Sequence, residues 1–284
     1  MAKTLIYIIG AGRSGTTLLD IMLGNSHDAI NLGEINRFFL RDGFPPKREN
    51  ASDVSAYWSS FKHLFDLNNQ KDYSYLNDLF KKHEYHTSLY KSVTRSSDIE
   101  YIKLLKLQYD ALHKKTDESI LIESSKYPVR ALNLSNYLDK EKFDIKYIYL
   151  KKDPVSVVSS FQKKNLEQPS KGFFNANIYY LVVNTICRIS MIFLKKRGHK
   201  VAEITYEDLT RNIANTIHEI EKDLDLDLTL LKNKICKGEK LKTGFLFDGN
   251  RIRLQESITL RQPKKNVKNI KFYLTRIINY IIYR

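Results

Sequence analysis

Hydrophobic and polar positions along the chain follow two alternating patterns. Short apolar runs rich in β-branched residues are typical of buried strands, and they occur at residues 4–9, 119–123, 145–150 and 200–204. Between them apolar residues recur at helical spacing, most clearly over residues 155–161 and 178–194. This alternation predicts a three-layer α/β fold, in which helices flank a central, mostly parallel sheet.

Residues 40–115 have a different composition, rich in Tyr, Phe, Lys, Asp and Asn, with helical spacing over residues 99–112. We expect them to form helices and loops that cap the sheet on the side where a second substrate binds. No repeat and no low-complexity linker interrupts the chain, which predicts a single domain over residues 1–284.

The last segment, residues 262–284, combines an apolar stripe with basic charge. It contains six Lys or Arg residues and no Asp or Glu, and this predicts a basic amphipathic helix. Such a helix packs on the body of the protein, lies on an anionic membrane as a peripheral contact, or pairs with a second copy. The residues of the stripe are Val267, Ile270, Leu274, Ile277 and Ile281.

Composition narrows the class of protein. The 284 residues are 42% hydrophobic and 28% charged, as in soluble globular proteins, and the net charge of +15 favours an anionic partner. Two cysteines exclude a disulfide scaffold and a cysteine-based zinc site, and they favour the cytoplasm. No stretch approaches the roughly 20 apolar residues of a membrane helix, and the N-terminus lacks the pattern of a signal peptide.

A glycine-rich loop at residues 10–15 joins the first predicted strand to a helix predicted over residues 16–24. Its GxGxxG spacing, with Glu34 downstream, formally matches a dinucleotide-binding fingerprint, although residues 27–33 make a poor second strand. The loop also approaches the GxxxxGK[ST] pattern of kinases and ATPases, but Thr16 stands where that pattern has lysine. The cation lies inside the loop instead, at Arg13.

The sequence RSGTT at residues 13–17, between a strand and a helix, resembles the 5′-phosphosulfate-binding loop of sulfotransferases that use PAPS (3′-phosphoadenosine 5′-phosphosulfate). The resemblance implies that backbone N–H groups at the start of the helix hold phosphate oxygens. It also implies that Arg13 stabilises the leaving phosphate, with no metal required. The donor-binding residues implied here are Gly12, Arg13, Ser14, Gly15, Thr16 and Thr17.

Two later segments resemble the parts of these enzymes that hold the 3′-phosphate. The sequence KKDP follows the third predicted strand and precedes a helix, so Lys152 matches the usual arginine and Ser160 the helix serine, with Ser159 as the alternative. Lysine is a point charge, whereas arginine binds phosphate through two hydrogen bonds. The sequence GNRIR then implies that Arg251 and Arg253 close over the same phosphate.

The residues expected on the acceptor side of the site come from two short sequence matches. Gly33-Glu34 resembles the GE segment of tyrosylprotein and carbohydrate sulfotransferases, whose glutamate is the proposed general base. The sequence ESSK, ending at Lys126, resembles the (D/E)SSK segment of bacterial and Golgi members. The resemblance implies that Lys126 neutralises the sulfonate while it is transferred.

Taken together, the resemblance implies an enzyme that moves a sulfonate from PAPS to a hydroxyl or amine and releases 3′-phosphoadenosine 5′-phosphate. Aromatic residues such as Trp58 suit sugar rings, so a saccharide or small metabolite is the expected acceptor, and nucleic acid is not. One alternative is a P-loop kinase or NTPase that uses ATP and Mg²⁺, with Asp153 as a metal ligand. Another is a non-enzymatic protein that binds acidic glycan or membrane through residues 262–284.

Overall fold

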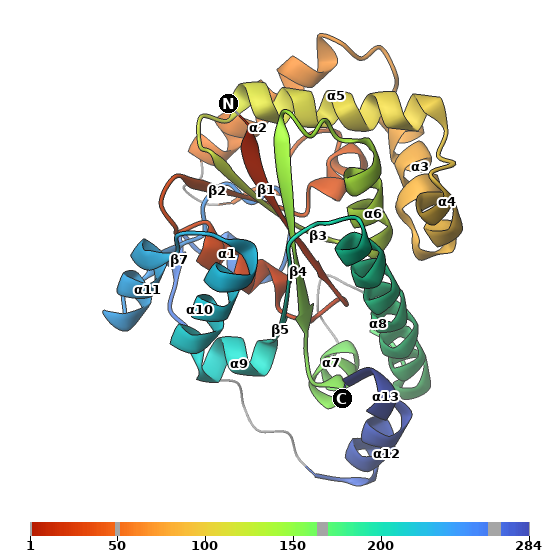
Figure 1. Cartoon of the computed structure of the whole chain (residues 1–284), viewed down its shortest axis with the longest axis vertical. Coiled ribbons are helices and arrows are strands. Elements are labelled where there is room, and N and C mark those ends of the chain that lie inside the picture. Colours follow the sequence, from red (N-terminus) through yellow and green to blue (C-terminus); the bar gives the residue numbers. More distant parts are fainter. Residues whose placement is uncertain (1, 49–51, 164–169, 261–267, 284) are drawn as a thin grey trace.

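Five parallel strands form the central sheet, in the order β2-β3-β1-β4-β5 (Figure 1). The computed structural model describes residues 2–48, 52–163, 170–260 and 268–283. The predicted α/β fold is confirmed, and each of the four predicted strands is present. The strands are β1 (Lys3–Gly10), β2 (Ala29–Gly33), β3 (Ile120–Lys126), β4 (Phe143–Lys151) and β5 (Val201–Thr205), with a small antiparallel pair, β6 (Leu241–Lys242) and β7 (Ser257–Ile258).

Helices cover both faces of this sheet. In β1, Ile6 and Ile8 are buried on one face, where α1 (Thr16–Leu23) and α10 (Ile213–Leu224) pack. Tyr7 and its neighbours on the other face are buried towards α6 (Pro128–Tyr137) and α8 (Phe173–Lys196). The other α-helices are α2 (Ser52–Asp66), α3 (Tyr73–Glu84), α4 (Leu89–Thr94), α5 (Ile99–Lys115), α7 (Pro154–Phe161), α9 (Tyr206–Arg211), α11 (Thr229–Cys236), α12 (Ile270–Ile278) and α13 (Tyr280–Tyr283).

The strand order places two loops side by side at the carboxyl end of the sheet. β1 and β4 are neighbours in register, with Gly10 opposite Leu150. The chain leaves β1 towards one edge of the sheet and leaves β4 towards the other, and ligands of open α/β sheets bind where connections diverge in this way. Because β3 lies between β1 and β2, the order also differs from the 3-2-1-4 arrangement of the classical dinucleotide fold.

Strand β2 corrects the expectation that residues 27–33 make a poor strand. Ala29–Gly33 pairs in parallel with β3 at the edge of the sheet. Its polar residue Asn31 is 2% exposed, and its amide donates to the carbonyl oxygen of Thr243 at 2.7 Å and accepts from Phe245 N–H at 3.2 Å. A strand whose polar side chain is satisfied by a segment more than 200 residues away has no local signal in the sequence.

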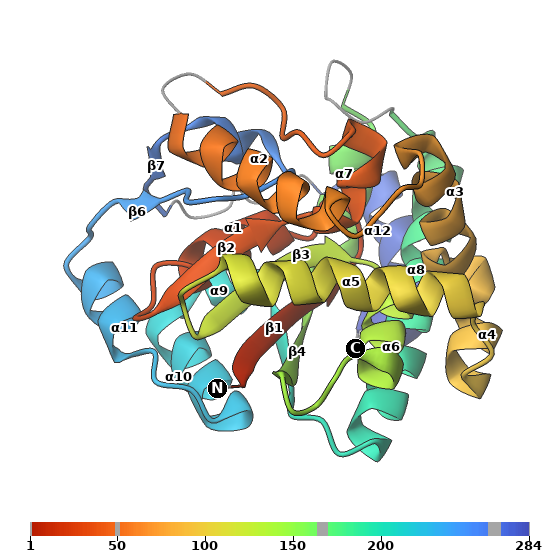
Figure 2. The same cartoon turned by 90° about the horizontal axis from the view of Figure 1, so that it is seen from above.

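Residues 40–115 form the expected helices, α2 to α5, and the loops between them. Figure 2 shows α5 crossing the sheet with α2 beside it. Trp58 is fully buried there, packs on Phe61 and Phe247, and donates its indole N–H to the Phe245 carbonyl oxygen at 2.7 Å. Trp58 is therefore a core residue of this cap and is not available to a sugar ring.

Helix α8 changes one expectation drawn from hydropathy. It is 24 residues long, and by length and composition alone it is apolar enough to cross a membrane, contrary to the expectation that no stretch is. Residues such as Val183, Cys187 and Leu194 are nevertheless buried in the core. Burial explains part of this apolar composition, since 44% of the most apolar window of α8 is buried in the fold.

The C-terminal segment is helical in its described part, but it packs by a different face from the one expected. Helix α12 begins at Ile270, and Val267 lies outside the described residues. The residues buried against the body are Thr275, Asn279 and Ile282. The stripe that includes Ile277 faces outwards instead.

Candidate functional site

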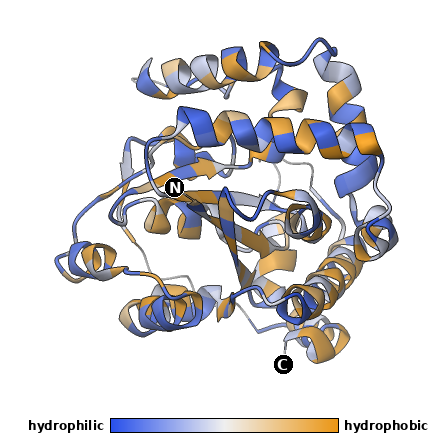
Figure 3. Ribbon diagram, turned by 45° about the horizontal axis from the view of Figure 1, so that its top comes forward, coloured by the Kyte–Doolittle hydropathy of each residue, from blue (hydrophilic) through white to orange (hydrophobic). Residues whose placement is uncertain are grey.

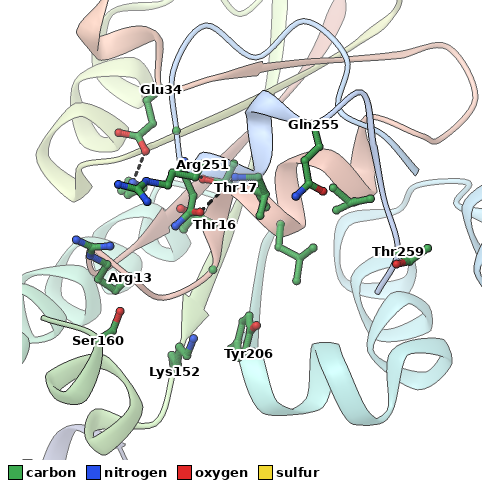
Figure 4. A pocket seen from close by; sticks show the side chains of 17 residues that line it. Arg13, Thr16, Thr17, Glu34, Lys152, Ser160, Tyr206, Arg251, Gln255 and Thr259 are labelled. Atoms are coloured by element: carbon green, nitrogen blue, oxygen red, sulfur yellow. Dashed lines mark hydrogen bonds and ion pairs between the residues drawn. The ribbon is translucent and has the colours of Figure 1, made fainter. Parts of the chain in front are cut away.

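A cavity of about 420 Å³ opens at the carboxyl ends of β1, β3 and β4 (Figure 4). The chain segments that the sequence singled out meet in this cavity, although they are far apart along the chain. Its wall contains Arg13, Gly15, Thr16, Thr17, Leu18, Glu34, Lys126, Lys152, Ser160, Tyr206, Gly249, Asn250, Arg251, Ile252, Gln255, Ile258 and Thr259.

The charge of this wall suits an anion. Among the lining residues, Arg13, Lys126, Lys152 and Arg251 are basic and Glu34 is the acidic one. Figure 4 shows that Arg13, Lys152 and Arg251 come from different segments of the chain that converge on the cavity. A wall with four cations and one carboxylate matches a ligand with several negative charges, such as a nucleotide with more than one phosphate.

The β1–α1 loop depends on backbone conformations that favour glycine. Gly15 has φ 99°, and a side chain there would bring Cβ to 2.4 Å from the ring of Tyr206. Arg13 also has a left-handed backbone, with φ 71°, and its guanidinium lies 5.6 Å from the centre of the Phe161 ring. Because of this loop conformation, the start of α1, with Thr16 and Thr17, lies in the cavity wall. The N–H groups at the start of a helix favour a bound anion there.

Two residues predicted to bind the donor, Gly12 and Ser14, belong to the loop but not to the cavity wall. The N–H of Gly12 donates to the hydroxyl of Tyr179 at 3.0 Å, and a Cβ on Gly12 would approach that hydroxyl to 2.9 Å. Ser14 is 1% exposed and does not line the cavity. Neither residue lines the cavity: Ser14 is buried, and the half-buried Gly12 packs against Tyr179.

The turn after β4 brings Lys152 and Ser160 to the opposite wall. The Lys152 ammonium lies 3.7 Å from the centre of the Tyr206 ring, and burial lowers its pKa while the nearby Glu207 carboxylate opposes that shift. Ser160 lines the cavity, whereas Ser159 is exposed and does not. Asp153 is the N-cap of α7, and its carboxylate accepts a hydrogen bond from the Ser156 N–H at 3.1 Å. A helix therefore begins directly after the KKDP sequence, as expected.

Glu34 and Lys126 form an ion pair at one end of the cavity. The second carboxylate oxygen of Glu34 is 3.2 Å from Nε of Arg37, so this acidic group is held from two sides. Gly33, with φ 73°, makes the placement possible, since a Cβ there would come within 2.5 Å of the Asp248 carbonyl oxygen. That oxygen accepts the N–H of Glu34 at 3.1 Å and fixes its backbone.

Residues 248–254 form the rim over the helix start. The N–H of Asn250 donates to the hydroxyl of Thr17 at 3.1 Å, which ties this segment to α1. Arg251 lines the cavity. Arg253 is 2% exposed, donates to the Gly249 carbonyl oxygen at 2.7 Å and pairs with Asp248 at 3.4 Å, so the structure places it inside the rim.

A second, smaller cavity of about 150 Å³ lies beyond the Glu34–Lys126 pair. Arg37 and Tyr127 lie in the wall of this cavity and link it to the larger one, because Arg37 pairs with Glu34 and Tyr127 follows Lys126 in the chain. Figure 1 places helix α3, which forms one side, at the outer edge of the cap. The wall consists of Asn36, Arg37, Leu40, Asn77, Phe80, Lys81, Glu84, Tyr85 and Tyr127.

Comparison with known proteins identifies the family. Residues 6–229 match the model of a family described as the sulfotransferase family, which is well over half of the chain. The chain belongs to the sulfotransferase family. Among curated proteins no match is found.

Solved structures of other sulfotransferases are similar to this chain at low sequence identity. The sulfotransferase domain from the curacin biosynthetic pathway is 15% identical, with a TM-score of 0.49, and the match covers 97% of this chain and 96% of that one. Sulfotransferase STF9 from Mycobacterium avium is 11% identical, with a TM-score of 0.51 and coverage of 99% and 76%. The match to STF9 shows that the two proteins share a fold.

Several lining residues of this sulfotransferase were not expected from its sequence. Tyr206 begins the sequence YEDL directly after β5, and its ring lies between Gly15 and Lys152. The requirement for glycine at position 15 is the one local signal that a large side chain lies nearby. Asn250 lies within the GNRIR segment but contributes its backbone, which no residue pattern predicts.

Proposed function

We propose that this sulfotransferase transfers the sulfonate of PAPS to a hydroxyl group of a small acceptor and releases 3′-phosphoadenosine 5′-phosphate. One observation carries the proposal: a single cavity joins the start of α1, the Lys152–Ser160 wall and the Glu34–Lys126 pair. The two anionic ends of such a donor therefore meet separate basic walls of one cavity, and the acidic group lies at the end where the acceptor would enter.

The residues present fit the donor. The start of α1 with Thr16 suits the 5′-phosphate, since helix N–H groups and a hydroxyl all donate. Lys152 and Ser160 suit the 3′-phosphate on the opposite wall. The apolar part of the wall, formed by Leu18, Ile252 and Ile258 beside the Tyr206 ring, suits the flat face of adenine.

In the proposed reaction, the donor supplies the sulfonate, whose bond to the bridging phosphate oxygen breaks while a new bond forms to the acceptor oxygen. Glu34 accepts the proton of the acceptor hydroxyl. Arg13 stabilises the negative charge that develops on the departing phosphate, and Lys126 stabilises the oxygens of the sulfonate. The Glu34–Lys126 ion pair suits these two roles, because it places the base for the acceptor hydroxyl next to the cation for the sulfonate oxygens.

We further propose that the acceptor occupies the smaller cavity and that it is a saccharide. Its wall offers the edges of Tyr85 and Tyr127 together with amides and charged groups, a mixture suited to sugar rings and their hydroxyls. The carbonyl oxygen of the Asn36 side chain is buried with no hydrogen-bond partner among the described residues. Such an oxygen can accept a hydrogen bond from a bound hydroxyl.

The Lys152→Ala variant tests the donor site. We expect its affinity for 3′-phosphoadenosine 5′-phosphate to fall at least about tenfold, a loss of about 1.4 kcal/mol, because it removes the cation beside the 3′-phosphate. Its affinity for AMP, which lacks that phosphate, should change by less than about twofold. Isothermal titration with both nucleotides measures the difference.

Lys151→Ala is the matched control for that titration. Lys151 precedes Lys152 in the chain, but its ammonium points to Glu203 at 3.9 Å and does not line the cavity. The Lys151→Ala variant should bind both nucleotides as the wild type does. Equal weakening of the two nucleotides in Lys152→Ala would show that Lys152 does not contact the 3′-phosphate.

An acceptor array tests the acceptor proposal. We expect sulfur-labelled PAPS to label neutral and amino sugars in preference to simple phenols and tyrosine peptides. Tyr85→Ala should raise KM for the best sugar more than it lowers kcat, since Tyr85 lies in the wall of the smaller cavity and away from the Glu34–Lys126 pair. Label found only on phenols would contradict the assignment to saccharides.

A further inference from the structure

The C-terminal helices expose three isoleucines and bury two polar residues, together with Ile282. Ile270, Ile277 and Ile281 are 79%, 72% and 77% exposed. On the same two helices Thr275 and Asn279 are 1% and 0% exposed. An amphipathic helix that packs on its own protein normally does the reverse, so the outward stripe of α12 and α13 calls for a partner.

Polar contacts hold these helices in place. The amide of Asn279 donates to the side-chain oxygen of Asn177 on α8 at 2.9 Å. Arg276 pairs with Asp153 at 3.0 Å, and the Tyr283 hydroxyl donates to Glu207 at 3.0 Å. These bonds fix the rotation of α12 and α13, and with it the outward direction of the isoleucines.

Helix α8 extends the apolar surface. Phe174, Ile178 and Val182 follow one another at intervals of four residues and are 70%, 58% and 46% exposed, so they form a stripe along α8. The contacts of α12 and α13 place them against this helix. Figure 3 shows hydrophobic colouring both on α8 and on the helices beside the C-terminus.

The charged residues of the C-terminal segment itself are all basic. Residues 262–284 contain six Lys or Arg and no Asp or Glu. Among the described residues of this segment, Lys268 and Lys271 are exposed beside the stripe, and Lys271 lies 5.9 Å from the ring of Phe173 at the start of α8. Apolar side chains bordered by lysines match the arrangement of interfacial helices that lie on anionic lipid.

We propose that the outward face of α12 and α13, together with the exposed stripe of α8, binds an anionic membrane surface. The isoleucines enter the boundary between headgroups and acyl chains, and Lys268 and Lys271 contact anionic headgroups. A second copy of the chain is the less suitable occupant, because pairing two such faces brings like charges together. The proposal is independent of the transfer reaction, since no residue of this face lines the cavity.

Sedimentation with lipid vesicles tests this proposal on the full chain. Vesicles of phosphatidylcholine with about one third phosphatidylserine should bind at least about tenfold more protein than pure phosphatidylcholine, and high salt should reverse the difference. Ile277→Asp should lose at least about tenfold of that binding. The far-UV circular dichroism spectrum and the midpoint of thermal unfolding serve as the check that the variant is folded and should equal those of the wild type.

Ile99→Asp is the matched control for the vesicle experiment. Ile99 is 72% exposed, as Ile277 is, but it lies at the start of α5 in the cap. It should bind vesicles as the wild type does. Vesicle binding by Ile277→Asp at the wild-type level, or a dimer in analytical ultracentrifugation that this substitution abolishes, would overturn the proposal.

Discussion

Replacing Glu34 with glutamine is expected to lower kcat of sulfonyl transfer by about 10²–10⁴-fold, the usual contribution of a general base. Glutamine keeps the size of the side chain and its place between Lys126 and Arg37 but cannot take up a proton. The affinity for 3′-phosphoadenosine 5′-phosphate should stay within about threefold of the wild type, since the role of Glu34 concerns the acceptor. Single-turnover transfer to a saturating acceptor measures the loss.

Glu221→Gln is the control for this experiment. Glu221 is also held from two sides, by Lys232 at 2.6 Å and by the Leu228 N–H at 2.9 Å, but it lies on α10 and away from the cavity. It should leave transfer unchanged. A Glu34→Gln enzyme that keeps more than about a tenth of the wild-type kcat would remove Glu34 from the role of base.

Replacing Arg13 with asparagine is the second substitution with a large expected effect. Arg13 is the cation of the β1–α1 loop, and loss of one group that stabilises developing charge costs about 10²–10³-fold in kcat. Asparagine is chosen because Arg13 has φ 71°, and asparagine adopts this left-handed backbone more readily than alanine does. The measurement is kcat with saturating donor and acceptor.

Arg95→Asn makes the same change at a matched position. Arg95 also has a left-handed backbone, with φ 57°, and it is exposed at the end of α4, outside the cavity. The effect of Arg95→Asn on kcat should be negligible. Because both substitutions place asparagine on a left-handed backbone, a loss of kcat seen only in Arg13→Asn is not caused by backbone strain. If Arg13→Asn and Arg95→Asn have the same kcat, Arg13 does not stabilise the leaving phosphate.

The sequence predicted the central part of the fold because its signals are local. The four predicted strands have short, mainly apolar runs, interrupted by Lys146 in β4 and by Glu203 in β5, and the structure has all four. Asn31 breaks that pattern in β2, and its hydrogen bonds to the distant Thr243 and Phe245 explain why it is buried there. The tail shows the same limit, since the direction of its apolar stripe depends on polar contacts such as Asn279 with Asn177.

The residues of the candidate site also divide into those that the sequence predicts and those that only the structure places. Arg13, Glu34 and Lys152 stand at the ends of strands, and residues there converge in a parallel sheet whatever the details of packing. Arg253 shows what a motif alone cannot predict, because its guanidinium turns inwards to Asp248 while its neighbour Arg251 lines the cavity. Two arginines separated by one residue look alike in the sequence, and only the conformation of the rim distinguishes them.

Isothermal titration of the wild-type protein with 3′-phosphoadenosine 5′-phosphate in EDTA tests the central claim most directly. The proposed donor site predicts micromolar binding that excess Mg²⁺ leaves unchanged, because the basic walls and the start of α1 compensate the charge of the phosphates. ATP serves as the comparison, with and without Mg²⁺. Absence of binding by 3′-phosphoadenosine 5′-phosphate, together with Mg²⁺-dependent binding of ATP, would contradict the proposal and assign the loop to a kinase-like activity.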